Sequence, residues 1–229
     1  MLIEYLPTLL DGTLVTLSVA GASLAIAVAL GLTGAAAKLS RLGWLRAIAT
    51  TYTTVIRGVP DLVLMLLIFY GGQVGVNQLA AALGHDGYID INPFVAGVAT
   101  IGFIFGAYLT ETFRGALMAI PAGQREAGLA FGMSPLKVLW RITVPQMIRL
   151  ALPGFTNNWL VLVKSTAIVS VIGLSDMMQR AGFAAGATQQ PFTFYLAAAG
   201  LYLAITSVSL IALNALNRRY SLGVRTGAA

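Results

Sequence analysis

The sequence predicts an all-α membrane protein, a polytopic bundle of about five transmembrane helices with a cytoplasmic helix-turn-helix. Of its 229 residues, 58% are hydrophobic and 10% are charged, whereas an ordinary soluble domain has roughly 25% charged residues. Apolar runs of about 20 residues, enough to cross a bilayer as a helix, recur along the chain. The net charge of +6 comes from basic residues scattered between these runs, which indicates a membrane-surface bias and no nucleic-acid partner.

Five apolar stretches are expected to be the spans of a single transmembrane domain that covers residues 1–229. They lie at about 13–36, 59–80, 93–113, 151–174 and 192–216. The stretch 44–57, WLRAIATTYTTVIR, is predicted to be an interfacial or half-inserted helix, which Gly58 and Pro60 separate from the second span. Small residues such as Gly21 and Gly102 are expected to let the spans pack closely.

The loops between the spans sort by charge, which predicts their orientation. One side collects the basic residues Lys38, Arg41, Arg46, Arg57, Arg114, Arg125, Lys137, Arg141, Arg149, Arg218, Arg219 and Arg225. The other side carries Glu4, Asp11, Asp86, Asp90 and Asp176, with Arg180 as its sole cation. Because positive loops stay in the cytoplasm, we expect a periplasmic N-terminus and a cytoplasmic C-terminus, which requires an odd number of spans.

The cytoplasmic loop 121–146 has the pattern of two short helices and is too polar to span a membrane. A first helix, GQREAGLAF, is followed by Gly132, which suits a left-handed cap. Ser134 and Pro135 are expected to begin a second helix, PLKVLWRI, and Pro145 to end it. The pair has an apolar side beside a basic one, which fits either a hairpin folded onto the membrane or a docking site for another protein.

This loop carries a motif made of Glu126, Ala127, Gly128, Gly132, Ile142 and Pro145. The motif resembles the "EAA…G…I-LP" loop of bacterial ABC importer permeases, with Gly128 where alanine is usual and Val144 where leucine is usual. The resemblance implies that the loop, including Ser134 and Pro135, forms coupling helices that insert into a groove on a cytoplasmic ATPase.

The resemblance extends over nearly the whole chain. The strings YTTVIRGVPDLVLMLLIFYG, GAYLTETFRGA and ALPGFTNNW are similar to the polar amino-acid family of these permeases, in particular to Q subunits for histidine, lysine, arginine and ornithine. This resemblance implies a paralogous M-type permease, two ATPase subunits, a periplasmic amino-acid-binding protein and a basic amino-acid substrate. An importer of another polar amino acid, such as glutamine, remains an alternative. A secondary transporter, which usually shows inverted repeats, and a membrane-embedded enzyme fit less well.

The chain lacks the residues for chemistry of its own. It has no Gly-Lys dipeptide and therefore no phosphate-binding loop of the G-x-x-x-x-G-K-[ST] type. One histidine and no cysteine argue against a catalytic or metal site. We therefore expect no catalytic residue and no cofactor in this chain, with ATP and Mg bound by the partner ATPase subunits.

Charged side chains in the hydrocarbon region are costly and indicate function. Glu111 either pairs with Arg114 three residues on, or faces a central cavity and binds a cationic group of the substrate. The resemblance favours the substrate role. Asp61 either interacts with the positive end of its helix and with Arg57, or contributes to an acidic cavity that selects cations.

Lys164 lies midway along the fourth span and is expected to be buried. A buried lysine needs a carboxylate or several acceptors, for which Glu111, Asn157 and Asn158 are candidates. A structural or gating pair is favoured over contact with a cationic substrate. Several permeases of the resembled family have an acidic residue after this lysine, where Ser165 stands here, so the share of the binding site that this subunit supplies stays open.

Three further positions complete the candidate sites. Arg57 is assigned a structural or gating role, as an interface residue that extends to the head groups or as the partner of Asp61. Tyr108 and Asn158 are candidates for lining the translocation path. The outer loops 84–91 and 175–191 are candidates for docking the binding protein.

Overall fold

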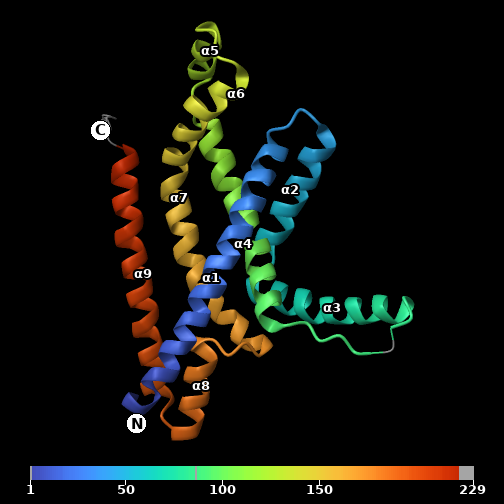
Figure 1. Cartoon of the computed structure of the whole chain (residues 1–229), viewed down its shortest axis with the longest axis vertical. Helices are drawn as coiled ribbons and strands as arrows, with labels where there is room; N and C mark the ends of the chain where they lie inside the picture. Colours follow the sequence, from blue (N-terminus) through green and yellow to red (C-terminus); the bar gives the residue numbers. More distant parts are fainter. Residues whose placement is uncertain (1, 86, 222–229) are drawn as a thin grey trace.

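The structure, a computed structural model, describes residues 2–85 and 87–221, and every regular element in them is helical (Figure 1). Asp86 and Arg225, which were counted among the loop charges, lie outside the described residues. In chain order the elements are α1 (Leu2–Lys38), α2 (Gly43–Gly58), α3 (Asp61–Ala82), α4 (Pro93–Met118), α5 (Ala122–Ala130), α6 (Pro135–Val138), a π-helical turn (Leu139–Thr143), α7 (Val144–Ser165), a 3₁₀ segment (Thr166–Ile172), α8 (Met177–Thr188) and α9 (Pro191–Ser221).

The predicted fold class is confirmed. Five helical stretches among the described residues are long and apolar enough to cross a membrane: Leu2–Lys38, Asp61–Ala82, Pro93–Met118, Pro135–Ile172 and Pro191–Tyr220. Each overlaps one of the five stretches expected from the sequence and extends beyond it at one or both ends.

The first helix begins at Leu2, well before the expected start at residue 13. At 37 residues it is about 55 Å long, whereas the hydrocarbon layer is about 30 Å thick. The extra turns pack against α8 and α9, where Leu9 is fully buried and the rings of Tyr5 and Phe194 meet edge to face at 5.3 Å. A second, smaller core therefore extends α1 beyond the main bundle.

The second and third helices are arranged differently from the expectation. α2 runs beside α1 and packs on α1 and α4, whereas α3 projects crosswise from the bundle (Figure 1). Ala49, Thr53 and Ile56 form the buried side of α2. The buried stripe of the stretch 44–57 is covered by two neighbouring helices, which fits the half-inserted alternative better than a helix that lies on the surface of the bundle.

The centre of the bundle is the pair α1 and α4. A Cβ on Gly31 would lie 2.7 Å from Leu109 Cβ, and one on Gly102 would lie 2.7 Å from Ile26 Cβ. Such distances are too short for any side chain, so glycine is required for this approach. Close packing at Gly102 is thus confirmed, whereas Gly21 faces open space.

The expectation that Pro145 ends a loop helix is wrong. Residues Pro135–Ile172 form one helical run, in which the π-helical turn joins α6 to α7. Within that turn the Val144 N–H donates to the Leu139 carbonyl, five residues back. Proline breaks a helix chiefly because it has no N–H and its ring crowds the preceding turn. The wider π-helical turn changes the bonding pattern directly before Pro145, so the helix continues into α7.

Candidate functional site

The loop 121–146 forms a helical hairpin, α5 and α6, that stands beyond one end of the bundle (Figure 1). Its local structure follows the expected signals. Gly132 has a φ of 77°, the left-handed conformation predicted for the cap. Ser134 is the N-cap of α6 and its hydroxyl accepts a hydrogen bond from the Lys137 N–H at 3.4 Å. Pro135 occupies the first turn of that helix.

Gly128 explains how the hairpin closes. It is the buried residue of α5, and a Cβ on it would lie 2.7 Å from Ile142 Cδ1 and 3.0 Å from Val138 Cγ2. The absence of a side chain lets α5 lie directly on the π-helical turn. An alanine, the usual residue of the resembled motif, would require the end of the flexible Ile142 side chain to shift.

The outer surface of the hairpin is apolar and basic together. Phe131, Leu136 and Trp140 are 90%, 64% and 62% exposed, and Glu126 and Ala127 are also exposed. We define the hairpin face by these apolar residues and their basic neighbours Arg125, Lys137 and Arg141. Large apolar side chains clustered on an exposed surface mark an interaction site.

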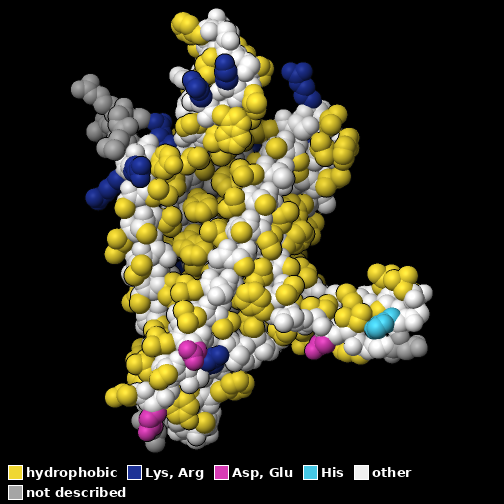
Figure 2. Space-filling view, in the orientation of Figure 1, with side chains coloured by type: hydrophobic (Ala, Val, Ile, Leu, Met, Phe, Trp, Pro, Cys, Tyr) yellow, Lys and Arg dark blue, Asp and Glu magenta, His cyan; other side chains and the backbone are white. Residues whose placement is uncertain are grey.

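Charge is distributed along the long axis of the molecule. Figure 2 shows Lys and Arg gathered toward the end that carries the hairpin and the end of α9, and Asp and Glu toward the opposite end. At that acidic end, the guanidinium of Arg180 lies 3.8 Å from the Asp11 carboxylate. The hairpin therefore lies at the basic end, which is the end that the loop charges predict to be cytoplasmic.

Glu111 lies at the centre of a three-residue ion-pair network. Lys38 of α1 forms an ion pair with one carboxylate oxygen of Glu111, and Arg114 approaches the other at 2.9 Å. Lys38 also donates to Thr53 Oγ1 of α2 at 2.7 Å. The network joins α1, α2 and α4, and the side chain of Glu111 is only 19% exposed. The pairing with Arg114 was expected, whereas Lys38 and Thr53 were missed because their approach depends on helix packing.

Arg57 and Tyr108 meet where α2 gives way to α3, and Asp61 begins α3 four residues after Arg57. The Arg57 guanidinium lies over the Tyr108 ring, 5.4 Å from its centroid. Asp61 occupies the first turn of α3, at the positive end of the helix, and is half-buried. Among the described residues Arg57 and Asp61 form no ion pair, so the expected direct pairing is replaced by a cation–π contact with Tyr108.

Asn158 connects to the same region from α7. Its amide donates to Thr112 Oγ1 at 2.9 Å, and the Thr112 hydroxyl donates to the Tyr108 carbonyl at 3.2 Å. The structure thus brings Tyr108 and Asn158, two candidates for lining a path, onto facing helices. Thr112 was not a candidate, and only the packing of α7 on α4 reveals its role.

The expectation that Lys164 is buried against Glu111, Asn157 or Asn158 is wrong for this chain. Lys164 is exposed on α7, and no ion pair or side-chain hydrogen bond reaches it within residues 2–85 and 87–221. Glu111 and Asn158 are engaged with other partners. The exposed ammonium lies in a span, so it requires acceptors from outside the chain.

Comparisons with known proteins agree with this architecture. The family model "Binding-protein-dependent transport system inner membrane component" matches residues 15–222. The chain is 51% identical over 225 residues to the histidine/lysine/arginine/ornithine transport system permease protein HisQ of Escherichia coli (strain K12), with 98% of each chain covered. It is 43% identical over 201 residues to the octopine transport system permease protein OccQ of Agrobacterium tumefaciens (strain Ach5), with 88% of this chain and 85% of that one covered.

A solved structure shares the fold. A chain of the crystal structure of an amino acid ABC transporter with histidines superposes with a TM-score of 0.80 at 31% identity, covering 95% of this chain and 96% of that chain. The alternatives of a secondary transporter and of a membrane-embedded enzyme are therefore discarded. The chain is a non-catalytic, multi-pass permease, and it belongs to the family of binding-protein-dependent transport system inner membrane components.

Proposed function

We propose that the chain is the Q-type permease subunit of an ATP-driven importer for basic amino acids: histidine, arginine, lysine and ornithine. The observation that carries this proposal is the identity of 51% to a permease named for these four substrates, over 98% of both chains. The half-buried carboxylate of Asp61, which forms no ion pair among the described residues, supports a cationic substrate, because an unmatched negative charge attracts cations.

A paralogous M-type permease is proposed to complete the translocation path. α3 projects from the bundle with Leu62, Val63 and Leu67 exposed, and a second permease would cover this surface. The same partner would supply acceptors to the exposed Lys164, whose ammonium is otherwise unmatched inside the hydrocarbon layer.

The other partners are assigned to the two ends of the molecule. The family implies an ATPase, and we propose two ATPase subunits. One of them would receive the hairpin face. ATP and Mg would be bound by the ATPase subunits. A periplasmic amino-acid-binding protein is proposed to dock on the outer loops 84–91 and 175–191. This arrangement requires the periplasmic N-terminus and cytoplasmic C-terminus that the loop charges predict.

The proposed mechanism depends on coupling between partner binding at one end of the molecule and partner binding at the other end. A loaded binding protein and ATP-bound ATPases can shift the permease between inward- and outward-facing states only if they bind those states with different affinities. The hairpin is held to the continuous helical run Pro135–Ile172 through the π-helical turn. Movement of the hairpin by the ATPase would therefore be transmitted along α7 to Asn158 and its partners on α4.

Asp61 and Glu111 are proposed to play different roles with respect to the substrate. The Glu111 carboxylate is already matched by Lys38 and Arg114, so the structure favours its role in holding α1, α2 and α4 together. Asp61 forms no ion pair in the described chain, so we assign the cation-facing role to Asp61, with Tyr108 and Asn158 lining the path.

Uptake by the reconstituted four-component complex in vesicles tests this function. Asp61→Asn is expected to raise the KM for arginine and lysine about tenfold, the loss of one charged contact, and to change uptake of neutral analogues little. Asp11→Asn at the acidic outer end is the matched control. Equal effects of Asp61→Asn on charged and neutral substrates would overturn the role of Asp61. If the wild-type complex took up glutamine but no basic amino acid, the proposed substrate class would be overturned. If Glu111→Gln alone produced the selective loss, the cation site would belong to Glu111.

A further inference from the structure

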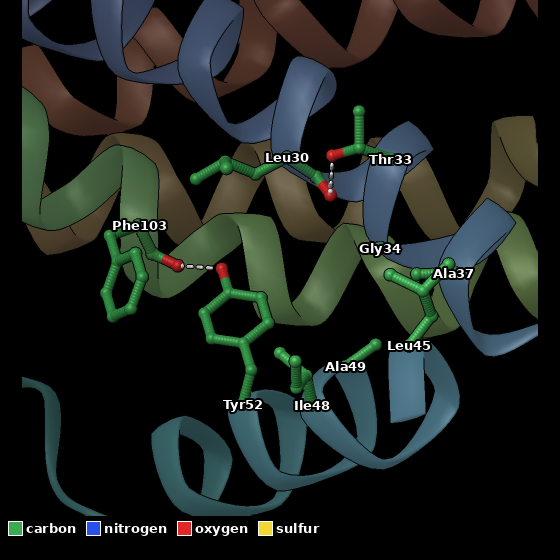
Figure 3. Close-up of a pocket in the computed structure, with 9 residues that line it drawn as sticks. All are labelled: Leu30, Thr33, Gly34, Ala37, Leu45, Ile48, Ala49, Tyr52 and Phe103. Atoms are coloured by element: carbon green, nitrogen blue, oxygen red, sulfur yellow. Dashed lines mark hydrogen bonds between the residues drawn. The ribbon is translucent and has the colours of Figure 1, made fainter. Parts of the chain in front are cut away.

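An apolar groove lies on the outside of the bundle between α1 and α2, with Phe103 of α4 at its floor (Figure 3). We call it the α1–α2 groove; its volume is about 440 Å³ and its lining includes Leu30, Ala37 and Ile48. Its polar groups are used within the protein. The Tyr52 hydroxyl donates to the Phe103 carbonyl at 2.5 Å, and the hydroxyl of Thr33 donates to the Leu30 carbonyl at 3.1 Å. The groove therefore offers an occupant an apolar surface.

Cationic side chains lie at one end of this groove. Arg41 is in the turn that joins α1 to α2, and Arg46 is in the first turn of α2, next to the lining residue Leu45. Both are exposed, and neither forms an ion pair in the part of the chain that the structure describes. Lys38, by contrast, is held by Glu111. Two basic side chains thus lack a counter-charge.

The same end has the features of a membrane–water interface. Trp44, between the two arginines, is 61% exposed, and exposed tryptophan is typical of the head-group level. From Leu30 to Lys38, where α1 ends, the helix rises about 12 Å, which approaches half of the roughly 30 Å hydrocarbon layer. The groove thus has the depth of one leaflet, with its cations at the leaflet surface.

We propose that the α1–α2 groove binds an acyl chain of an anionic phospholipid, whose head-group phosphate pairs with Arg41 and Arg46. Basic pockets between transmembrane helices on the cytoplasmic side are suited to such head groups. A zwitterionic lipid matches the two arginines less well because it carries its own cation. The inference goes beyond the proposed import function and shares with it only the membrane setting.

The intact complex, purified and mixed with equal amounts of phosphatidylglycerol and phosphatidylcholine, tests the site by native mass spectrometry. The wild type is expected to retain phosphatidylglycerol preferentially. Arg41→Gln with Arg46→Gln is expected to weaken that binding about 30-fold, from the loss of two charges near the membrane surface. The matched control replaces the same number of charges at the basic end without touching the groove, with Arg149→Gln and Arg219→Gln.

Two further variants test the apolar part of the site. Ala37→Phe fills the groove and is expected to lower lipid retention, whereas Ala212→Phe on the exposed surface of α9 leaves it unchanged. A photo-crosslinking residue in place of Ile48 should attach to lipid. Equal lipid retention by wild type and the double arginine variant, or a crosslink from position 48 to a permease polypeptide, would overturn the proposal. Because these measurements use neither substrate nor ATP, their failure leaves the import function unaffected.

Discussion

Some polar side chains of this permease are held by partners that lie far away in the sequence. Glu111 is the clearest case, since one of its oxygens accepts from Lys38 of α1, 73 residues away, and the other from Arg114 on its own helix. A carboxylate in an apolar bundle is stable only when a positive charge balances it. Removing one partner of a buried ion pair therefore destabilises the protein more than removing one partner of an exposed ion pair. The network therefore fixes the relative positions of α1, α2 and α4.

Asp176 is a second buried carboxylate, at the acidic end and outside the spans. It is fully buried, is the N-cap of α8, and one of its oxygens accepts from the Gln179 N–H at 2.9 Å. The other oxygen has no partner among the described residues. Burial raises the pKa of Asp176 to about 6, although the hydrogen bond from the Gln179 N–H and the charge of Arg180 act in the opposite direction.

Stability should therefore depend on pH through Asp176. Between about pH 4 and pH 6 the unfolded carboxyl group ionises while the folded one keeps its proton, so the free energy of unfolding falls as pH rises through this window and stays lower above it. Asp176→Asn keeps a capping side chain that does not titrate. We expect it to unfold at a higher temperature than the wild type at pH 7.5 and at about the same temperature near pH 4. Thermal unfolding of the purified complex across this range, with Asp11→Asn as control, measures the difference; a difference that does not change with pH would contradict the assignment.

Among the elements, the hairpin of α5 and α6 depends on the backbone conformation of one residue. Gly132 has a φ of 77° and nothing lies within 4 Å of the position where a Cβ would be. A substitution there acts through the backbone alone, because no side-chain clash is introduced. A β-branched residue is strongly disfavoured in this region of φ, whereas asparagine is tolerated.

Replacing Gly132 should therefore uncouple ATP hydrolysis from uptake, and the extent of uncoupling should depend on how well the new residue tolerates a positive φ. Gly132→Val is expected to cost about 1–2 kcal/mol in the hairpin conformation, to lower uptake and to leave ATP hydrolysis by the complex less coupled to transport. Gly132→Asn is expected to behave nearly like the wild type. Uptake and ATPase rates measured on the same vesicles give the coupling ratio. Gly123→Val, in the same hairpin but at an ordinary φ and in open space, is the control; equal coupling in all three variants would remove the hairpin from the coupling mechanism.

At the scale of the whole molecule, the basic end and the acidic end are separated along the long axis (Figure 2). Loop charge of this kind orients a membrane protein with its basic end in the cytoplasm. The hairpin and the end of α9 lie at the basic end, and the start of α1 lies at the other (Figure 1). In the proposed orientation the hairpin would face a cytoplasmic ATPase and the outer loops would face a periplasmic binding protein.

Labelling of single introduced cysteines tests this orientation. The chain has no cysteine of its own, so no native thiol is labelled. Ser134→Cys in the hairpin should react with a membrane-impermeant thiol reagent only from the cytoplasmic side. Asp90→Cys, an exposed position in the loop before α4, should react only from the periplasmic side. Labelling of intact cells and of inverted vesicles distinguishes the two, and the opposite pattern would refute the orientation and with it the ATPase role of the hairpin.

Features that depend on short stretches were predictable from the sequence. Each apolar segment must satisfy its own backbone groups in the membrane, so length and apolarity predict a helix without knowledge of its neighbours. The hairpin was predictable for the same reason, since Gly132 and Ser134 act on the turns next to them. The motif around Glu126 and the absence of a phosphate-binding loop were sufficient to indicate a permease without an ATPase of its own.

The remaining features depend on how segments far apart in the sequence pack together. The pairing of Glu111 with Lys38 requires the register of α1 against α4, which is set by close contact at Gly31 and Gly102. The placement of α2 in the bundle, the crosswise α3 and the exposure of Lys164 follow from the same packing. A single segment carries no information about which of its sides a neighbour will cover, and for that reason these features became visible only when the helices were placed together.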